Sequence, residues 1–267
     1  MTSLEAGDAT IVYDSQGSGP PLLLLAATAF HGGVWKLFDL PDLARDHQVI
    51  AFDQRGTGAS TTRSQDFTTT ALAQDALALL DKLDIERAHL FGHSNGGRVA
   101  QYLAIHHPDR VASLILASAG GTHKTRGISV DMCRNLVERG YEGYSRNHAI
   151  KTGCSSSDPV EQARAEAFLH EFIGHLAPLE TFLRYVVSRQ EADTTSALDR
   201  IAVPVMVLVG ENEGKLPGDS HMNFALDIKE KIPTAILHVF AGQGHFYPFL
   251  QPAKVHDLVR SFILGNL

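Results

Sequence analysis

The residues of this chain best suited to chemistry lie in the stretch Leu90-Phe91-Gly92-His93-Ser94-Asn95-Gly96-Gly97. It has the form G-x-S-x-G, and it stands between an apolar run that predicts a buried strand and a pattern that predicts a helix. A serine at such a sharp turn is held in a strained conformation, and the small residues two before and two after it let the chain fold back. The turn also aims the backbone N–H of Asn95 and the positive end of the helix at negative charge formed beside Ser94. This context favours a nucleophile of acyl transfer over an incidental serine in a glycine-rich turn.

The elements that must position Ser94 follow from the hydrophobic pattern. Short apolar runs bounded by turn residues predict strands, and apolar residues at helical spacing predict helices between them. Strands that alternate with helices imply a parallel sheet. The expected strands are Thr10–Tyr13, Leu22–Leu25, Val49–Phe52, Ala88–Phe91, Val111–Ala117, Pro204–Gly210 and Ala235–Phe240, and the expected helices are about Thr69–Leu83, Gly96–His107, Ser220–Ile232 and Pro252–Ile263.

Residues 120–200 break this alternation. Helical segments are expected near Val130–Glu138, Val160–Ile173 and Leu179–Arg189, and polar turn clusters separate them. Apolar residues in these segments could line a pocket, although such residues at helical spacing more often pack in a core. They are Phe168, Phe172, Leu176, Phe182 and Tyr185.

In its serine motif and in the order of its elements, the chain resembles the α/β-hydrolases over nearly its whole length. The resemblance implies an α/β fold with a mostly parallel central sheet flanked by helices. It also implies a helical cap inserted after the sixth strand. Residues 1–119 and 201–267 would form the hydrolase core, and residues 120–200 would form the cap or lid.

The resemblance places the partners of Ser94 downstream, because the order in this fold is serine, acid, histidine. His245 lies in the glycine-bounded loop after the last strand, where the base of the family lies. The acid of the family stands three residues after the strand that ends at Gly210, and this chain has Glu213 there. A glutamate can hold the imidazole as an aspartate does. Glu211 and Asp219 are the alternatives.

The sequences of two further loops can be compared with the motifs that are usual in the family, and only one of them matches. The loop after Leu25 usually begins His-Gly, but here the pair is Ala26-Ala27, so by position Thr28 donates the second oxyanion N–H beside Asn95. The loop from Asp53 to Ser60 has the frequent form D-x-R-G-x-G-x-S. We expect its Asp53 and Arg55 to fix a glycine-rich turn rather than to catalyse.

Three further residues are candidates for substrate binding: His31, Trp35 and Phe246. Trp35 could equally be a core anchor. His93 is common before the nucleophile of the family and usually packs beneath the turn.

We expect no cofactor and no metal ion. The adjacent His106 and His107 would diverge on a helix. The five-residue separation of His170 and His175 also does not place two ligands on one face.

Composition limits the class of partner. The net charge is −7, with 23 basic and 30 acidic residues and no basic run, so neither nucleic acid nor an anionic membrane is expected as a partner. The longest apolar run, Leu22 to Phe30, is too short to span a membrane, and the N-terminus lacks a signal pattern. Cys133 and Cys154 lack the spacing of a zinc site and are expected to be ordinary thiols. We expect a cytoplasmic protein that binds a small-molecule substrate, and a homodimer is left open.

The function expected is hydrolysis of an ester or lactone of a small, largely apolar compound through a Ser-His-Glu triad and an acyl-enzyme. A C–C bond hydrolase of a ring-cleavage product would use the same triad and a more polar pocket, to which Arg184 or Arg189 could contribute. A ligand receptor with a slow triad and a cofactor-free oxygenase are alternatives on the same fold, because fold alone does not settle the reaction.

Overall fold

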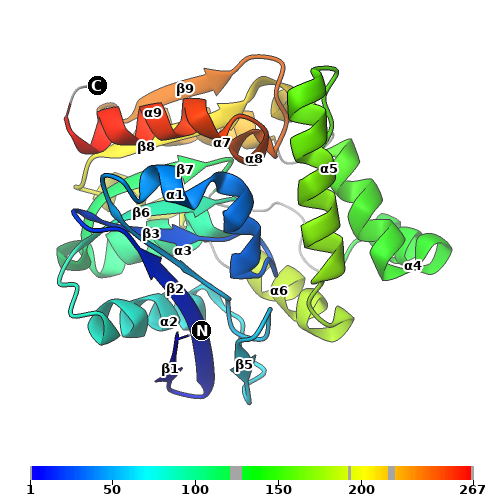
Figure 1. Ribbon diagram of the computed structural model, residues 1–267, viewed down its shortest axis with the longest axis horizontal. Coiled ribbons are helices and arrows are strands. Elements are labelled where there is room, and N and C mark those ends of the chain that lie inside the picture. The colour runs from blue at the N-terminus through cyan, green and yellow to red at the C-terminus, as the bar shows by residue number, and fades with distance from the viewer. Residues whose placement is uncertain (1, 121–127, 192–193, 216–219, 266–267) are drawn as a thin grey trace.

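The strands of the described chain form one sheet, in the order β1-β2-β4-β3-β6-β7-β8-β9, with β5 paired to β2 (Figure 1). The structure is a computed structural model and describes residues 2–120, 128–191, 194–215 and 220–265. The sheet is parallel from β4 to β9, and β1, β2 and β5 pair antiparallel at its edge. The strands are β1 (Thr2–Ala6), β2 (Ala9–Gln16), β3 (Pro21–Leu25), β4 (Gln48–Phe52), β5 (Thr61–Thr62), β6 (Ala88–His93), β7 (Val111–Ala117), β8 (Val205–Gly210) and β9 (Ile236–Phe240).

Helices cover both faces of the sheet, as the continuous apolar strands require. Successive side chains of a strand point to opposite faces, so Leu23 and Leu25 join one core while Leu22 and Leu24 join the other, and all four are at most 2% exposed. The first core packs against α2 (Thr69–Lys82), α3 (Asn95–His106) and α7 (His221–Lys231). The second packs against η1 (Gly32–Phe38), α1 (Leu40–Leu43), α8 (Tyr247–Leu250) and α9 (Pro252–Ile263). Short 3-10 turns complete the core: η2 (Pro108–Arg110), η3 (Thr195–Arg200) and η4 (Glu211–Lys215).

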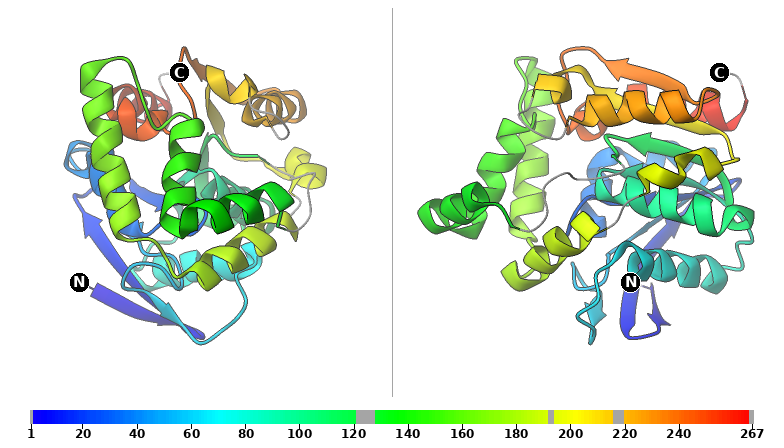
Figure 2. Two further views of the ribbon diagram at one scale, coloured as in Figure 1. Left: turned by 90° about the vertical axis from the view of Figure 1, so that its right-hand side faces the viewer. Right: turned by 180° about the vertical axis from the view of Figure 1, so that it is seen from behind.

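Three helices stand between β7 and β8 in the sequence: α4 (Val130–Lys151), α5 (Pro159–Gly174) and α6 (Leu179–Glu191). We call residues 128–191 the insertion. It lies across one end of the sheet, and the left view of Figure 2 looks directly onto its helices. In the sequence the insertion stands between the strands expected at Val111–Ala117 and Pro204–Gly210.

The first helix of the insertion is longer than the sequence indicated. The expected helix ended near Glu138, whereas α4 continues to Lys151 across a kink at Gly140, where φ is 68° and ψ is 173°. Gly140 and Gly143 mark a break in the sequence pattern, but packing carries the chain past them. Tyr141 and Tyr144 place their rings 5.2 Å and 6.0 Å from that of Phe182 on α6.

Strand β1 was also not predicted. It buries only Leu4 and Ala6, so its alternation is too short to be distinguished from an N-terminal tail. Within the residues that the structure describes, no helix has the length and apolar character needed to cross a membrane.

Candidate active site

Ser94 stands at the turn between β6 and α3 in a conformation that few side chains adopt. Its φ is 55° and its ψ is −115°, so the predicted strain at this serine is present in the backbone. The turn is held by two hydrogen bonds. The N–H of Ser94 donates to the Ala117 oxygen at 2.9 Å, and the N–H of Gly97 donates to the Ser94 oxygen at 3.0 Å. Strain that persists only because its surroundings fix it is a common feature of catalytic turns.

The glycines of the motif are required by close backbone approach. A Cβ at Gly92 would come within 2.5 Å of the Gly97 Cα and within 2.6 Å of the Gly96 oxygen. A Cβ at Gly96 would collide with the backbone oxygen of Leu25 on β3. The sharp turn therefore depends on missing side chains on both sides of Ser94, which is the physical content of the G-x-S-x-G pattern.

His245 and Glu213 meet across the ends of two neighbouring strands. Glu213 follows β8 and is fully buried, and its Oε2 lies 2.8 Å from Nδ1 of His245, which follows β9. A carboxylate there fixes the ring with its proton on Nδ1 and leaves Nε2 able to accept a proton. Burial alone would raise the pKa of Glu213, but attraction to His245 and hydrogen bonds from His245 and Ser118 outweigh it and lower that pKa to about 2. Glu213 is therefore ionised at neutral pH.

The alternative acids are placed differently. Glu211 is exposed, and its Oε2 accepts the backbone N–H of Gly242 at 2.8 Å, so it fixes the loop that carries His245 from the outside. Asp219 lies outside the described residues.

Two residues that the sequence did not indicate also contact Glu213. The Ser118 hydroxyl donates to Oε1 at 2.6 Å, beside the Gly210 N–H at 2.9 Å. His221, at the start of α7, places Nδ1 3.2 Å from Oε2, the oxygen that also binds His245. No local motif marks either residue, because each reaches Glu213 only when separate loops meet at the sheet edge.

His93 lies beneath the turn, where the family resemblance placed it. It is fully buried, and its Nε2 donates to the backbone oxygen of His245 at 3.0 Å. Burial lowers its pKa to about 3, so the ring is neutral and acts as a spacer between the strand end and the histidine loop.

The loop that replaces the family's His-Gly pair is held by a side chain from the next strand end. Nε2 of the buried Gln54 donates to the oxygens of Ala27 at 2.7 Å and Phe30 at 3.1 Å. Asp53 binds the N–H groups of Gly32 and Ala59 at 2.6 Å and 2.8 Å. These contacts fix the turn around Thr28 although the usual glycine is missing.

Arg55 forms a buried bidentate ion pair with Asp75, with both contacts at 2.7 Å. Its guanidinium is therefore occupied within the core, away from Ser94.

Ser94 and His245 open into one cavity of about 110 Å³ between the sheet end and the insertion. Four phenylalanine rings form one part of its wall, and Tyr144, Ser145 and His148 of α4 form another. Of the two predicted oxyanion donors, Thr28 lines the same cavity as Ser94, and Asn95 directly follows Ser94 in the sequence. Besides Thr28, Ser94 and His245, the wall residues are Ala27, Phe30, Tyr144, Ser145, His148, Ala149, Thr152, Phe172, Phe182 and Phe246.

A comparison with known families shows which family this chain belongs to. The model of the α/β hydrolase fold matches residues 20–158, which is more than half of the chain. The chain belongs to the α/β hydrolase family. It is a hydrolase, and its relatives differ in the bond they cleave.

Three relatives illustrate that range. The hydrolase is 27% identical to RutD of Pseudomonas syringae pv. syringae, whose name suggests carbamate hydrolysis, over 93% of this chain and 95% of that protein. It is 28% identical to 2-hydroxymuconate semialdehyde hydrolase of Pseudomonas sp. strain CF600, over 97% and 92% of the two chains. The solved structure of Est816, described as an N-acyl homoserine lactone degrading enzyme, superposes with a TM-score of 0.79 at 25% identity, over 98% and 100% of the chains.

The hydrolase does not bring all the predicted binding residues to this cavity. Phe246 lines it, but Trp35 is fully buried among the rings of Phe38, Phe91 and Phe249 at 5.4–5.9 Å, which is the core role left open in the sequence. His31 is buried at the start of η1 and faces α5 rather than Ser94; its ring lies 5.0 Å from that of His175.

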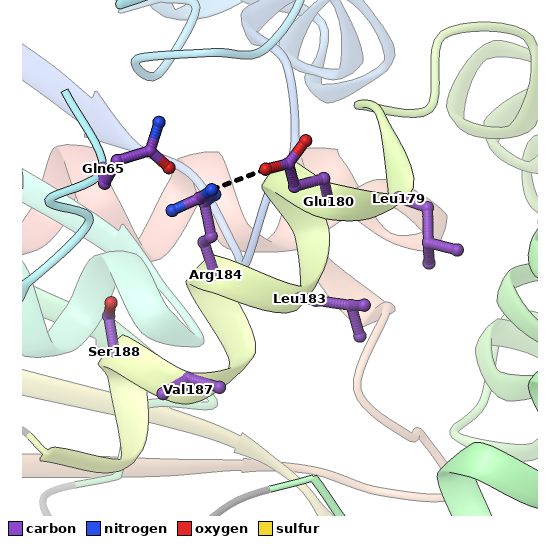
Figure 3. A pocket seen from close by; sticks show the side chains of 7 residues that line it. All are labelled: Gln65, Leu179, Glu180, Leu183, Arg184, Val187 and Ser188. Atoms are coloured by element: carbon purple, nitrogen blue, oxygen red, sulfur yellow. Dashed lines mark hydrogen bonds and ion pairs between the residues drawn. The ribbon is translucent and has the colours of Figure 1, made fainter. Parts of the chain in front are cut away.

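A second hollow of the hydrolase lies along α6 (Figure 3), and Ser94 is not among the residues that line it. Its polar side chains include Arg184 and Glu180, which form an ion pair at 2.5 Å. Arg184 was a candidate for a polar pocket of a C–C hydrolase, but it lines this separate hollow and is paired there. The side chain of Arg189 lies outside the described residues.

Proposed function

We propose that this hydrolase cleaves an ester or lactone bond of a small, largely apolar substrate through Ser94, His245 and Glu213. The observation that carries the proposal is that His245 is bound to a buried, ionised Glu213 and opens into the same cavity as Ser94. A strained serine, a base with a fixed tautomer and a buried acid are the parts that acyl transfer needs.

The reaction proceeds in two halves. Ser94 attacks the carbonyl carbon while Nε2 of His245 takes the hydroxyl proton, and Glu213 stabilises the imidazolium that forms. The backbone N–H groups of Thr28 and Asn95 hold the oxyanion. His245 then protonates the leaving oxygen, and water attacks the acyl-enzyme with His245 again as the base.

The size and lining of the cavity select a short acyl group. An engineered cavity of about 150 Å³ holds benzene, so about 110 Å³ accommodates roughly four or five heavy atoms. The rings of Phe30, Phe172 and Phe182 favour an apolar group there, while Tyr144 and His148 offer polar contacts on the side of α4.

C–C bond hydrolysis is the second candidate, because polar side chains of α4 line the cavity and one relative is a semialdehyde hydrolase. In that case Tyr144 and His148 would bind the keto or carboxylate end of the substrate.

The test is a burst assay with p-nitrophenyl esters of increasing chain length, together with simple lactones and a muconic semialdehyde. We expect a burst of p-nitrophenol equal to the enzyme concentration, with acetate to butyrate preferred over octanoate. Ser94→Ala and His245→Ala should each abolish the burst. Turnover of the semialdehyde in the absence of any ester or lactone turnover would refute the ester assignment.

A further inference from the structure

A second group of potential metal ligands lies where the insertion meets the core, apart from the catalytic residues. His31 precedes η1, while Glu171 and His175 lie in the last turn and at the C-terminal cap of α5. Each offers one ligand atom, and the three atoms lie within 4.8 Å of one another. Glu171 is placed closely over η1, because a Cβ on Gly33 would come within 2.9 Å of its Oε1.

His31 contributes a buried ring nitrogen that lacks a hydrogen bond of ordinary geometry. The residue is 4% exposed, and its Nδ1 accepts the N–H of Gly33 at 3.1 Å. Its Nε2 is buried, and no described residue gives it a hydrogen bond of ordinary geometry.

His175 is arranged as metal-binding histidines commonly are. Its Nδ1 donates to the backbone oxygen of Glu171 at 3.0 Å, which leaves Nε2 as the ring atom able to bind. Oε1 of Glu171 lies 3.7 Å from the same Nδ1. The nearby carboxylate of Asp53, bound to the Gly32 N–H, adds negative charge that favours a cation.

We propose that His31, Glu171 and His175 bind a divalent transition-metal ion of the zinc type. Two imidazoles and one carboxylate are a common zinc ligand set, with water in the fourth position. Ligand atoms about 2.1 Å from zinc stand about 3.4 Å apart in a tetrahedron, so the group must contract slightly. The partly exposed side chains of Glu171 and His175 can rotate to do so. The Nε2 proton of His31 must move to Nδ1 and the Gly33 hydrogen bond must open, so we expect micromolar rather than nanomolar affinity.

The ion would link α5, through Glu171 and His175, to the loop that carries Phe30 and His31. The ring of Phe30 packs against Phe172 and Phe168 of α5 at 4.6 Å and 5.8 Å, and Phe30 and Phe172 line the catalytic cavity. The bound ion would therefore stabilise the wall of the cavity without touching the reacting atoms.

The experiment must separate this site from the catalytic residues, because Glu213, His221 and His245 also form a group able to hold a metal ion. We would titrate Zn²⁺ by calorimetry into the chain carrying His245→Ala, which removes one ligand of the catalytic group. The second variant adds His175→Ala, the most exposed of the three proposed ligands, with a side chain 58% exposed. The matched control adds His170→Ala instead, because His170 is an exposed histidine of the same helix.

We expect one equivalent of Zn²⁺ in the His245→Ala chain, unchanged affinity with His170→Ala, and at least tenfold weaker binding with His175→Ala. Zn²⁺ should also raise the melting temperature of the His245→Ala chain, and His175→Ala should remove that increase. Absence of saturable binding in the His245→Ala chain, or equal affinity after His175→Ala, would overturn the site.

Discussion

The sheet end that carries Ser94 and the insertion that covers it are built in opposite ways. Around Ser94 the backbone itself fills the space, and no Cβ fits at Gly92 or Gly96. In α4, by contrast, Val137 is 86% exposed and a Cβ on Gly140 would meet nothing within 4 Å. The comparison indicates that close backbone contacts fix the geometry at Ser94, while α4 has open space at Val137 and Gly140.

The largest expected effect is on kcat, and it tests whether catalysis at the sheet end depends on the carboxylate of Glu213. Glu213→Gln should lower kcat by about 10³- to 10⁴-fold, because the amide cannot stabilise the imidazolium. Glu211→Gln, two residues away, should change kcat less than threefold. Steady-state kinetics on both variants decide the acid, and equal losses would contradict the assignment to Glu213.

The next prediction concerns a direct contact between the insertion and the loop that carries His245. The His245 N–H donates to the Thr152 oxygen at 2.7 Å, and a Cβ on Gly153 would come within 2.6 Å of the Gly244 Cα. Gly153→Ala should therefore displace His245 and lower kcat roughly 10- to 100-fold.

Gly140→Ala is the matched control, because Gly140 also has a positive φ but has open space around it. It should cost about 1 kcal/mol of unfolding free energy and leave kcat unchanged. If both variants kept full activity, the insertion would not position the catalytic loop.

A smaller effect should appear in substrate choice. Phe172→Ala removes a ring from the cavity wall and should move the preferred ester two to four carbons longer while kcat for the acetate ester falls only a few-fold. Val160→Ala, on the exposed face of the same helix, should leave the preference unchanged. Chain-length profiles of kcat/KM measure the shift, and an unaltered profile for Phe172→Ala would place acyl binding elsewhere.

The last predicted effect concerns stability rather than activity, as a pH dependence of the free energy of unfolding that arises beneath the turn. In the folded chain the pKa of His93 falls from 6.5 to about 3, so the unfolded chain binds more protons between these pH values. Stability from this group is therefore complete above pH 6.5 and is lost as the pH falls toward 3. At pH 5 the loss amounts to about 2 kcal/mol.

Urea unfolding at pH 7 and pH 5 measures that loss. His93→Asn should lower stability at both pH values but should lose about 2 kcal/mol less than the wild type between them. An equal pH dependence in the two proteins would show that His93 does not titrate as its burial requires.

The sequence predicted the core well because its strands carry their pattern locally. Val111–Ala117 and Pro252–Ile263 have the predicted bounds, since a run of apolar residues or a proline at the first turn marks each. The second half of α4 was missed because Gly140 and Gly143 resemble a helix end, and only contact with Phe182 shows otherwise.

The site was predictable where position in the fold decides and unpredictable where side chains converge from distant loops. Glu213 and His245 follow adjacent strands, so chain order was enough to bring them together. Ser118 and His221 reach Glu213 without any motif. Trp35 has the same local signal whether it faces a pocket or a core, and only the rings around it distinguish the two.

The central claim is that Ser94 forms a covalent intermediate, and intact mass spectrometry after treatment with diethyl p-nitrophenyl phosphate tests it most directly. The wild type should gain one diethylphosphoryl group, located by peptide mapping on Ser94, and Ser94→Ala should gain none. His245→Ala should react at least 10²-fold more slowly. An unmodified wild type, or a label on any other residue, would contradict the account.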